Sequence, residues 1–211
     1  MQGKRGDRRV NRTRRLLREA LMSLILERGY DAVTVEEITN RADVGRTTFY
    51  LHYKDKEDLL VESIDTAIND LVLQISNLSV ASWAIPYDSL APQESPRSPI
   101  LLVFQHASDN ADLYRIILRG EGSSRAQNRI RDVISDAVSD FLSMKASQEG
   151  MTVKPIIPLE VFSIYFAGSL LGILTWWLES DMPFSTSQIA SMFEKLAFPG
   201  ARDVLGITFR D

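Results

Sequence analysis

The chain has 211 residues, of which 45% are hydrophobic and 25% charged, a composition typical of a globular protein with a real hydrophobic core. It contains no cysteine and only two histidines, which excludes disulfides, zinc ribbons and thiol nucleophiles. The sequence also offers no glycine-rich phosphate loop and no cluster of metal ligands. We therefore expect no enzymatic activity, no cofactor and no metal site.

Charge is unevenly distributed along the chain. Residues 1–56 hold 13 Lys and Arg against 8 Asp and Glu, whereas residues 57–211 hold 11 against 20. A basic segment joined to an acidic one predicts a polyanion as the partner of the first segment only. Residues 1–11 are predicted to be a flexible basic arm, which either adds affinity for that partner or merely solvates the chain.

Helical patterns dominate the first 60 residues. From about Arg12 to Arg28 leucines recur at helical spacing, and Gly29 ends the pattern. Thr34-Val35-Glu36-Glu37 is a capping-box sequence that predicts the start of a short helix. Asp43-Val44-Gly45 then reads as a turn, and a second short helix is predicted from about Arg46 to Tyr50.

The rest of the chain also reads as helical, so the predicted fold class is all-α. Asp55 is a good N-cap for a long helix that reaches about Leu78. Residues 80–99 carry four prolines and are predicted to be a loop. Further helices are predicted at about 100–109, 111–119, 124–148, 159–179 and 187–197. The last of these opens with a second capping-box pattern, Ser185-Thr186-Ser187-Gln188.

The segment from about Arg12 to Leu60 has the layout of a helix-turn-helix that reads DNA. It predicts three helices with tight turns, of which the last two are very short. A small apolar core is expected from Val35, Ile38, Val44, Phe49 and Tyr53 against Leu17, Leu21 and Leu24. Polar groups suited to phosphates and base edges surround that core: Arg46, Thr47, Thr48, Tyr50, His52, Lys54 and Lys56.

The run from Thr34 to Leu60 resembles the TetR/AcrR family of transcription regulators. The resemblance lies in four features: the capped helix, the Val44-Gly45 turn, Phe49-Tyr50-Leu51-His52-Tyr53, and Lys54-Asp55-Lys56-Glu57-Asp58-Leu59. Tyr53 stands where phenylalanine is commoner in the family. Over the whole segment from about Arg12 to Leu60 the match covers about 50 residues, and beyond residue 80 only length and all-helical character agree.

The resemblance implies a homodimeric DNA-binding regulator, more often a repressor, with a near-palindromic operator. Its DNA-binding domain would span residues 1–56, and residues 57–211 would bind an effector and form the dimer. Arg46, Thr47 and Thr48 would face bases, with Arg46 able to fork onto guanine. The residues expected at phosphates are Thr34, Tyr50, His52, Lys54 and Lys56. The plainer alternatives are a cap alone for Thr34 and solvated side chains for His52 and Lys54.

The segment Val161–Leu178 contains no charged residue and is long enough to cross a membrane. A helix that is apolar all round also suits the centre of a dimer, and Gly168 and Gly172 would let another helix approach closely. The family pattern places the dimer bundle on about 159–179 and 187–197. A pocket for a small apolar or aromatic effector is implied, with Phe104, Tyr114, Phe166 and Trp176 as candidate lining residues.

The expected mechanism follows from geometry, because two recognition helices must meet successive major grooves at a fixed separation. A ligand that favours a different separation must weaken DNA binding. The helix that begins at Asp55 joins the pocket to the reading head. Two alternatives stay open: a regulator without an effector that answers to a protein partner, and a membrane-tethered regulator. No signal-peptide pattern is present, and a cytoplasmic location is expected.

Overall fold

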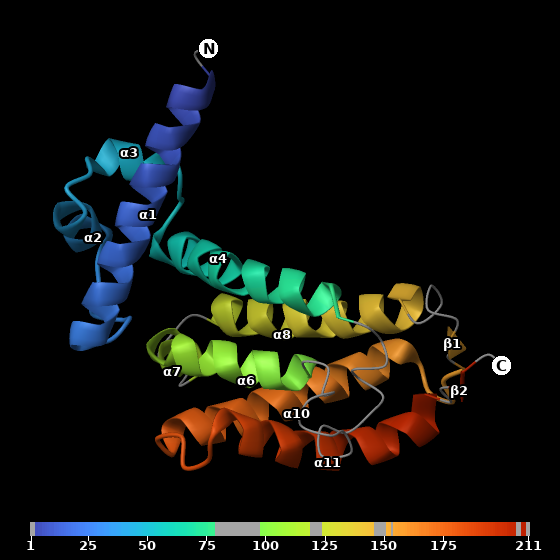
Figure 1. Ribbon diagram of the computed structural model, residues 1–211. Helices are drawn as coiled ribbons and strands as arrows, with labels where there is room; N and C mark the ends of the chain where they lie inside the picture. The colour runs from blue at the N-terminus through green and yellow to red at the C-terminus, as the bar shows by residue number, and fades with distance from the viewer. Residues whose placement is uncertain are drawn as a thin grey trace. The chain divides into compact units, whose positions relative to one another are not determined.

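The computed structural model describes residues 3–78, 98–118, 124–145, 151–152, 154–205 and 208–209. Helices make up nearly all of the described chain, which confirms the predicted all-α class (Figure 1). The exception is a pair of two-residue strands, β1 (Met151–Thr152) and β2 (Thr208–Phe209), which run antiparallel. Strands this short leave no alternation in the sequence, so they could not be predicted.

The chain forms two compact units. Unit 1 comprises Met1–Ala67 and Asp112–Arg129, and unit 2 comprises Ile68–Ala111 and Ile130–Asp211. Helices α4 (Lys56–Ser76) and α8 (Ser124–Asp140) are therefore each divided between unit 1 and unit 2. Compact units are not the same as independently folding domains, so the division into domains 1–56 and 57–211 stays a prediction.

Helix α1 (Gly3–Arg28) begins well before the predicted start at about Arg12, so most of the expected basic arm is helical here. The physical reason is that no proline interrupts this arginine-rich stretch, and arginine is a good helix former. The Thr13 hydroxyl also donates to the Arg9 carbonyl at 3.0 Å, one turn back. As predicted, the helix ends at Gly29, which takes the left-handed conformation (φ 82°).

Helices α2 (Val35–Arg41) and α3 (Arg46–Tyr50) follow, and α2 packs against both α1 and α3 (Figure 1). The turn between them is closed by Asp43, which has φ 52°. Most of the predicted core is buried: Leu17, Leu21, Leu24, Ile38, Phe49 and Tyr53. Val35 and Val44 are only half-buried. Unit 1 also contains most of α7 (Ala111–Leu118).

In unit 2, α6 (Pro99–Asp109) packs against α11 (Thr186–Leu205), and α10 (Leu159–Glu179) packs on both. Buried Ser98 caps α6, and its hydroxyl donates to the buried carboxylate of Glu194 on α11. Phe104 and Trp177 meet edge to face with ring centroids 5.4 Å apart. Aromatic packing and one buried polar anchor therefore hold this helical layer together.

Several boundaries differ from those predicted. The C-terminal part of the helix predicted at 124–148 becomes a π-helical turn, η2 (Phe141–Lys145). Helix α11 continues through Pro199 to Leu205, beyond the predicted end at about 197. The predicted loop at 80–99 lies outside the described residues, except for Ser98 and Pro99, which start α6.

Helix α10 is long and apolar enough to cross a membrane by length and composition alone, and 44% of its most apolar window is buried. Its buried side chains include Phe166, Leu170 and Trp177, which belong to the core of unit 2. Packing within unit 2 therefore accounts for part of the apolarity of α10, whereas Val161, Ile164 and Tyr165 are exposed.

Candidate nucleic-acid interface

Helix α3 has one face in the core and one face in solvent. Phe49 is fully buried and Tyr53 nearly so, and their ring centroids lie 5.6 Å apart. Arg46, Thr47 and Tyr50 are exposed, as is Leu51, the C-cap of the helix. The inner residues thus fix the helix to the unit, and the outer residues are available to a partner.

Of the predicted contacts, the structure brings together Arg46, Thr47, Thr48, Tyr50 and His52 on α3 and the turn that follows it. Thr48 and His52 are half-buried at the flank of this surface. Lys54, two residues further on, is exposed.

Arg46 forms a weak ion pair. Its guanidinium lies 3.6 Å from the Glu36 carboxylate, and the two side chains are 60% and 65% exposed. Exposed pairs of this length contribute little free energy, so Arg46 can leave Glu36 for a base edge at small cost. The pair also places Arg46 against the first turn of α2.

Thr34 has the capping role that the sequence predicted. Its hydroxyl donates to the Glu37 carboxylate at 2.7 Å and accepts from the Glu37 backbone N–H at 3.3 Å. The Glu37 carboxylate in turn accepts from the Thr34 backbone N–H at 2.9 Å. These bonds from Thr34 hold the pKa of Glu37 below its usual value. Thr34 remains exposed, so a phosphate contact is sterically open to it.

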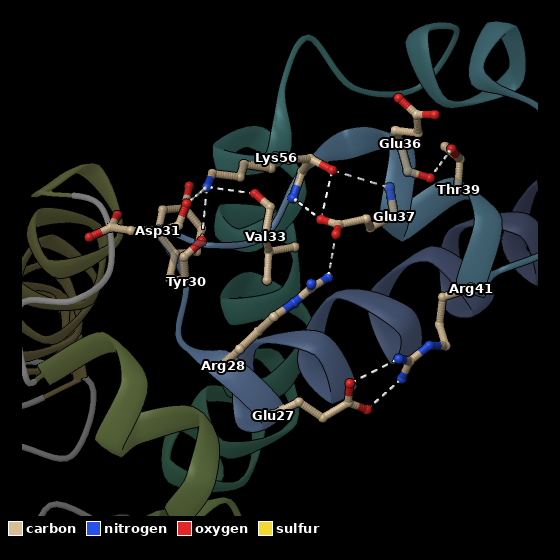
Figure 2. Close-up of polar contacts among 11 residues, drawn as sticks. Glu27, Arg28, Tyr30, Asp31, Val33, Glu36, Glu37, Thr39, Arg41 and Lys56 are labelled. Carbon is tan, nitrogen blue, oxygen red and sulfur yellow. Dashed lines mark hydrogen bonds and ion pairs between the residues drawn. The ribbon is translucent and has the colours of Figure 1, made fainter.

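Lys56, which was expected at a phosphate, lies at the start of α4 and contacts backbone carbonyls of its own chain. Its ammonium donates to the backbone carbonyls of Tyr30 and Val33, each at 2.8 Å, and of Asp31 at 3.3 Å (Figure 2). It also lies 4.3 Å from the centroid of the Tyr30 ring. An ammonium has three donors, and all three are used here. Lys56 therefore fastens the start of α4 to the loop between α1 and α2.

Two further ion pairs hold α2 to α1, and neither was predicted from the sequence. Arg41 reaches Glu27 through two hydrogen bonds of 2.6 and 2.9 Å, and Arg28 reaches Glu37 at 2.8 Å (Figure 2). The hydrogen bond from Arg41 lowers the pKa of Glu27 to about 2. Opposite charges 14 residues apart carry no local signal, so only the folded chain reveals this pair.

Within unit 1, α4 is held to α1 and α8 by a second set of contacts. Arg14 lies 3.4 Å from Glu62, and Arg18 donates to Thr66 at 3.0 Å. From α8, Arg129 pairs with Asp65 at 2.7 Å. Several arginines that raise the basic count of this segment therefore have structural partners.

The four candidate pocket residues do not share one environment. Phe104 and Phe166 are buried in unit 2, where Phe166 meets Phe193 edge to face at 5.4 Å. Trp176 is 49% exposed, and Tyr114 is a buried residue of unit 1 whose pKa is raised by that burial. The pocket stays a prediction.

A cavity of about 360 Å³ lies elsewhere, between α10, α11 and the segment before α10. Its lining includes Val161, Phe162, Tyr165, Leu196 and Gly200. Val161, Tyr165 and Leu196 are at least half-exposed. This cavity therefore opens on an apolar outer face of unit 2.

That face continues along α10 and α11. Ile164 and Met192 are exposed on it, and a Cβ added at Gly168 or Gly172 would meet nothing within 4 Å. An exposed apolar face of this kind is typical of an interaction surface. The helices are those on which the sequence resemblance placed the dimer.

Comparisons with known proteins agree with these features. A family model described as "Bacterial regulatory proteins, tetR family" matches residues 17–62, and one described as "Transcriptional regulator C-terminal region" matches residues 94–198. The uncharacterized HTH-type transcriptional regulator YxbF of Bacillus subtilis (strain 168) is 38% identical over 77 residues, 36% of this chain and 20% of that protein. This chain covers less than half the length of the first two curated relatives that it matches, 20% and 41%.

Other similarities extend over most of the chain. The HTH-type transcriptional activator FasR of Mycolicibacterium smegmatis is 23% identical over 210 residues, 94% of this chain and 90% of that protein. Among solved structures, the regulator FadR from Bacillus subtilis in complex with stearoyl-CoA superposes with a TM-score of 0.63 at 17% identity, covering 88% of this chain and 97% of that one. At this identity the structural similarity shows the fold.

Proposed function

This chain belongs to the TetR family of bacterial regulatory proteins, and we propose that it binds double-stranded DNA as a homodimer and thereby regulates transcription. The observation that supports this most directly is the exposed polar face of α3. Phe49 and Tyr53 brace that face from inside, as a helix that enters a major groove requires.

We assign the contacts with bases to Arg46, Thr47 and Thr48. The contacts with phosphates are assigned to Thr34, Tyr50, His52 and Lys54. The weak pairing of Arg46 with Glu36 supports its assignment, because bidentate contact with guanine would replace it at small cost. Lys56 was predicted to bind phosphate as well. Its three carbonyl contacts favour a role in shaping the surface, and a direct phosphate contact would require it to give up at least one of them.

The dimer is proposed to form through α10 and α11. The exposed apolar residues Val161, Ile164, Tyr165 and Leu196 and the open space at the glycines support this assignment. A partner seated there would also cover the cavity of about 360 Å³.

Selection of bound duplexes from a random DNA pool tests the DNA-binding proposal. We expect a near-palindromic site, because each recognition helix of a two-fold dimer reads one half-site. An alanine at Arg46 should broaden the selected motif, whereas an alanine at Leu26, an exposed residue of α1, should leave it unchanged. Failure of the wild-type protein to enrich any sequence would contradict the proposal.

We further propose that the protein is a repressor and that a small apolar ligand releases it from its operator. The structural neighbour FadR is named in complex with stearoyl-CoA, and this supports an acyl compound as the first probe. The name of FasR is that of an activator, so the direction of regulation must be measured. Reporter expression with and without the intact gene would decide it.

Intrinsic fluorescence offers a test of the ligand proposal. Trp177 is 1% exposed and touches Phe104, whereas its neighbour Trp176 is 49% exposed. A ligand that enters the core beside Phe104 should change the emission of Trp177. Stearoyl-CoA titration should then give a signal that Trp177→Phe loses and Trp176→Phe keeps.

By linkage, the same compound must weaken operator binding by the factor by which DNA weakens the compound. A compound that quenches Trp177 and leaves operator affinity unchanged would show binding without regulation. That result would contradict the release mechanism.

A further inference from the structure

We propose that Leu51, together with Thr47, recognises the 5-methyl group of thymine in the major groove and so sets part of the sequence specificity. This inference rests on the proposed DNA binding and assigns a base contact to a residue outside the polar set. It would make one face of α3 an apolar reader between polar flanks.

The position of Leu51 follows from the helix geometry. Its backbone N–H donates to the Thr47 carbonyl at 3.1 Å, and its φ and ψ of −71° and −22° continue the right-handed turn. At about 100° per residue, Thr47 and Leu51 each lie about 160° around the axis from Phe49. Since Phe49 points into the core, these two residues are centred on the opposite, outward face.

Leu51 is more exposed than the other large apolar and aromatic side chains of α3 and the turn that follows it. Leu51 is 76% exposed, and Tyr50 beside it is 53% exposed. Single exposed leucines are ordinary on protein surfaces, so exposure alone would mean little. Here the leucine lies one turn from Thr47 on the outward face of the helix, next to the proposed phosphate contacts Tyr50 and His52.

The chemistry of the groove identifies what Leu51 would contact. Thymine presents a methyl group at C5 in the major groove, and this is the apolar feature that side chains read there. Leucine offers no hydrogen bond, so polar base edges give it no preference. Thr47 carries a methyl group of its own and can extend the same apolar strip.

Deoxyuridine provides the test, because it differs from thymidine only by the absent methyl group. The probe is the duplex selected from the random pool, with each thymine replaced in turn by uracil. Burial of one methyl group corresponds to about a fourfold change in affinity. We expect wild-type protein to lose about that factor at one symmetric pair of positions, for each methyl removed.

Leu51→Ala should discriminate less between the thymine and uracil duplexes at those positions, because only the smaller methyl groups of Thr47 and the new alanine remain, whereas Leu51→Met should keep the difference. The matched control Leu26→Ala removes a leucine that is 54% exposed on α1, and should also keep it. Since both side chains are solvent-facing, neither alanine is expected to unfold the protein.

The proposal is overturned if wild-type protein binds its selected duplex but discriminates thymine from uracil at no position. It is equally overturned if Leu51→Ala retains the full discrimination. A wild-type protein that selects no duplex would refute DNA binding itself, and that outcome is distinct from the first two.

Discussion

Replacing Lys56 by alanine should destabilise the folded chain, because this side chain ties α4 to the loop after α1. Two of its hydrogen bonds are 2.8 Å long and the third is 3.3 Å. A hydrogen bond to a charged group is worth roughly 1.5–3 kcal/mol, and an exposed cation–π contact about 0.5–1 kcal/mol. The loop carbonyls can recover water once the ammonium is gone, so these values do not add. We expect a net loss of about 2–3 kcal/mol.

Equilibrium unfolding in urea, monitored by circular dichroism, measures this loss. The matched control is Lys54→Ala, which removes the same charge from an exposed position two residues away and should cost less than about 0.5 kcal/mol. Lys56→Met retains the apolar stem but not the donors. It should be nearly as destabilising as Lys56→Ala, if the hydrogen bonds account for the effect.

The salt dependence of DNA binding then distinguishes a structural role of Lys56 from a direct contact with phosphate. Each lost phosphate contact reduces the slope of log affinity against log salt by about 0.9. Because backbone carbonyls occupy the donors of Lys56, replacing this residue should leave that slope unchanged. A variant as stable as the wild type, with the slope reduced by about 0.9, would refute the structural role and restore the phosphate contact.

Three further outcomes are expected. Arg46→Ala should cost roughly 1–3 kcal/mol at one base position per half-site and relax the preference there, as measured by binding to single-substitution duplexes. Glu27 has a folded pKa of about 2 against an ordinary 4.5, so its pairing with Arg41 stabilises the protein above about pH 4.5 and is lost as the pH falls toward 2. The stability gap between wild type and Glu27→Gln should therefore close over that range in urea titrations. Leu196→Glu puts a charge on the apolar face of α11, where the wild-type side chain is 72% exposed, and should give monomers by light scattering. A variant that remains dimeric would place the interface elsewhere.

The sequence predicted those parts of the fold that short-range chemistry determines. The capping boxes at Thr34 and Ser185 form as expected, with each side chain bonded to the residue three positions later. Asp55 likewise accepts from the Asp58 backbone N–H at 2.8 Å. Each of these signals lies within one helical turn, so it can be read without knowledge of the tertiary structure.

The parts that could not be predicted depend on residues that meet only after folding. Lys56 contacts carbonyls more than 20 residues away in the chain, and backbone carbonyls have no sequence identity to read. The pairing of Arg41 with Glu27 is similarly non-local. The intramolecular partners of these basic residues therefore could not be predicted from the sequence.

The two-sided build of α3 bears on how this regulator can change its target over evolutionary time. Stability depends on Phe49 and Tyr53, which are buried, whereas recognition is assigned to neighbours that are exposed. Mutations at Arg46, Thr47 or Leu51 can therefore alter the preferred operator without being purged for misfolding. For the same reason, a library of variants randomised at the exposed positions could be used to engineer regulators with new operators on an unchanged scaffold.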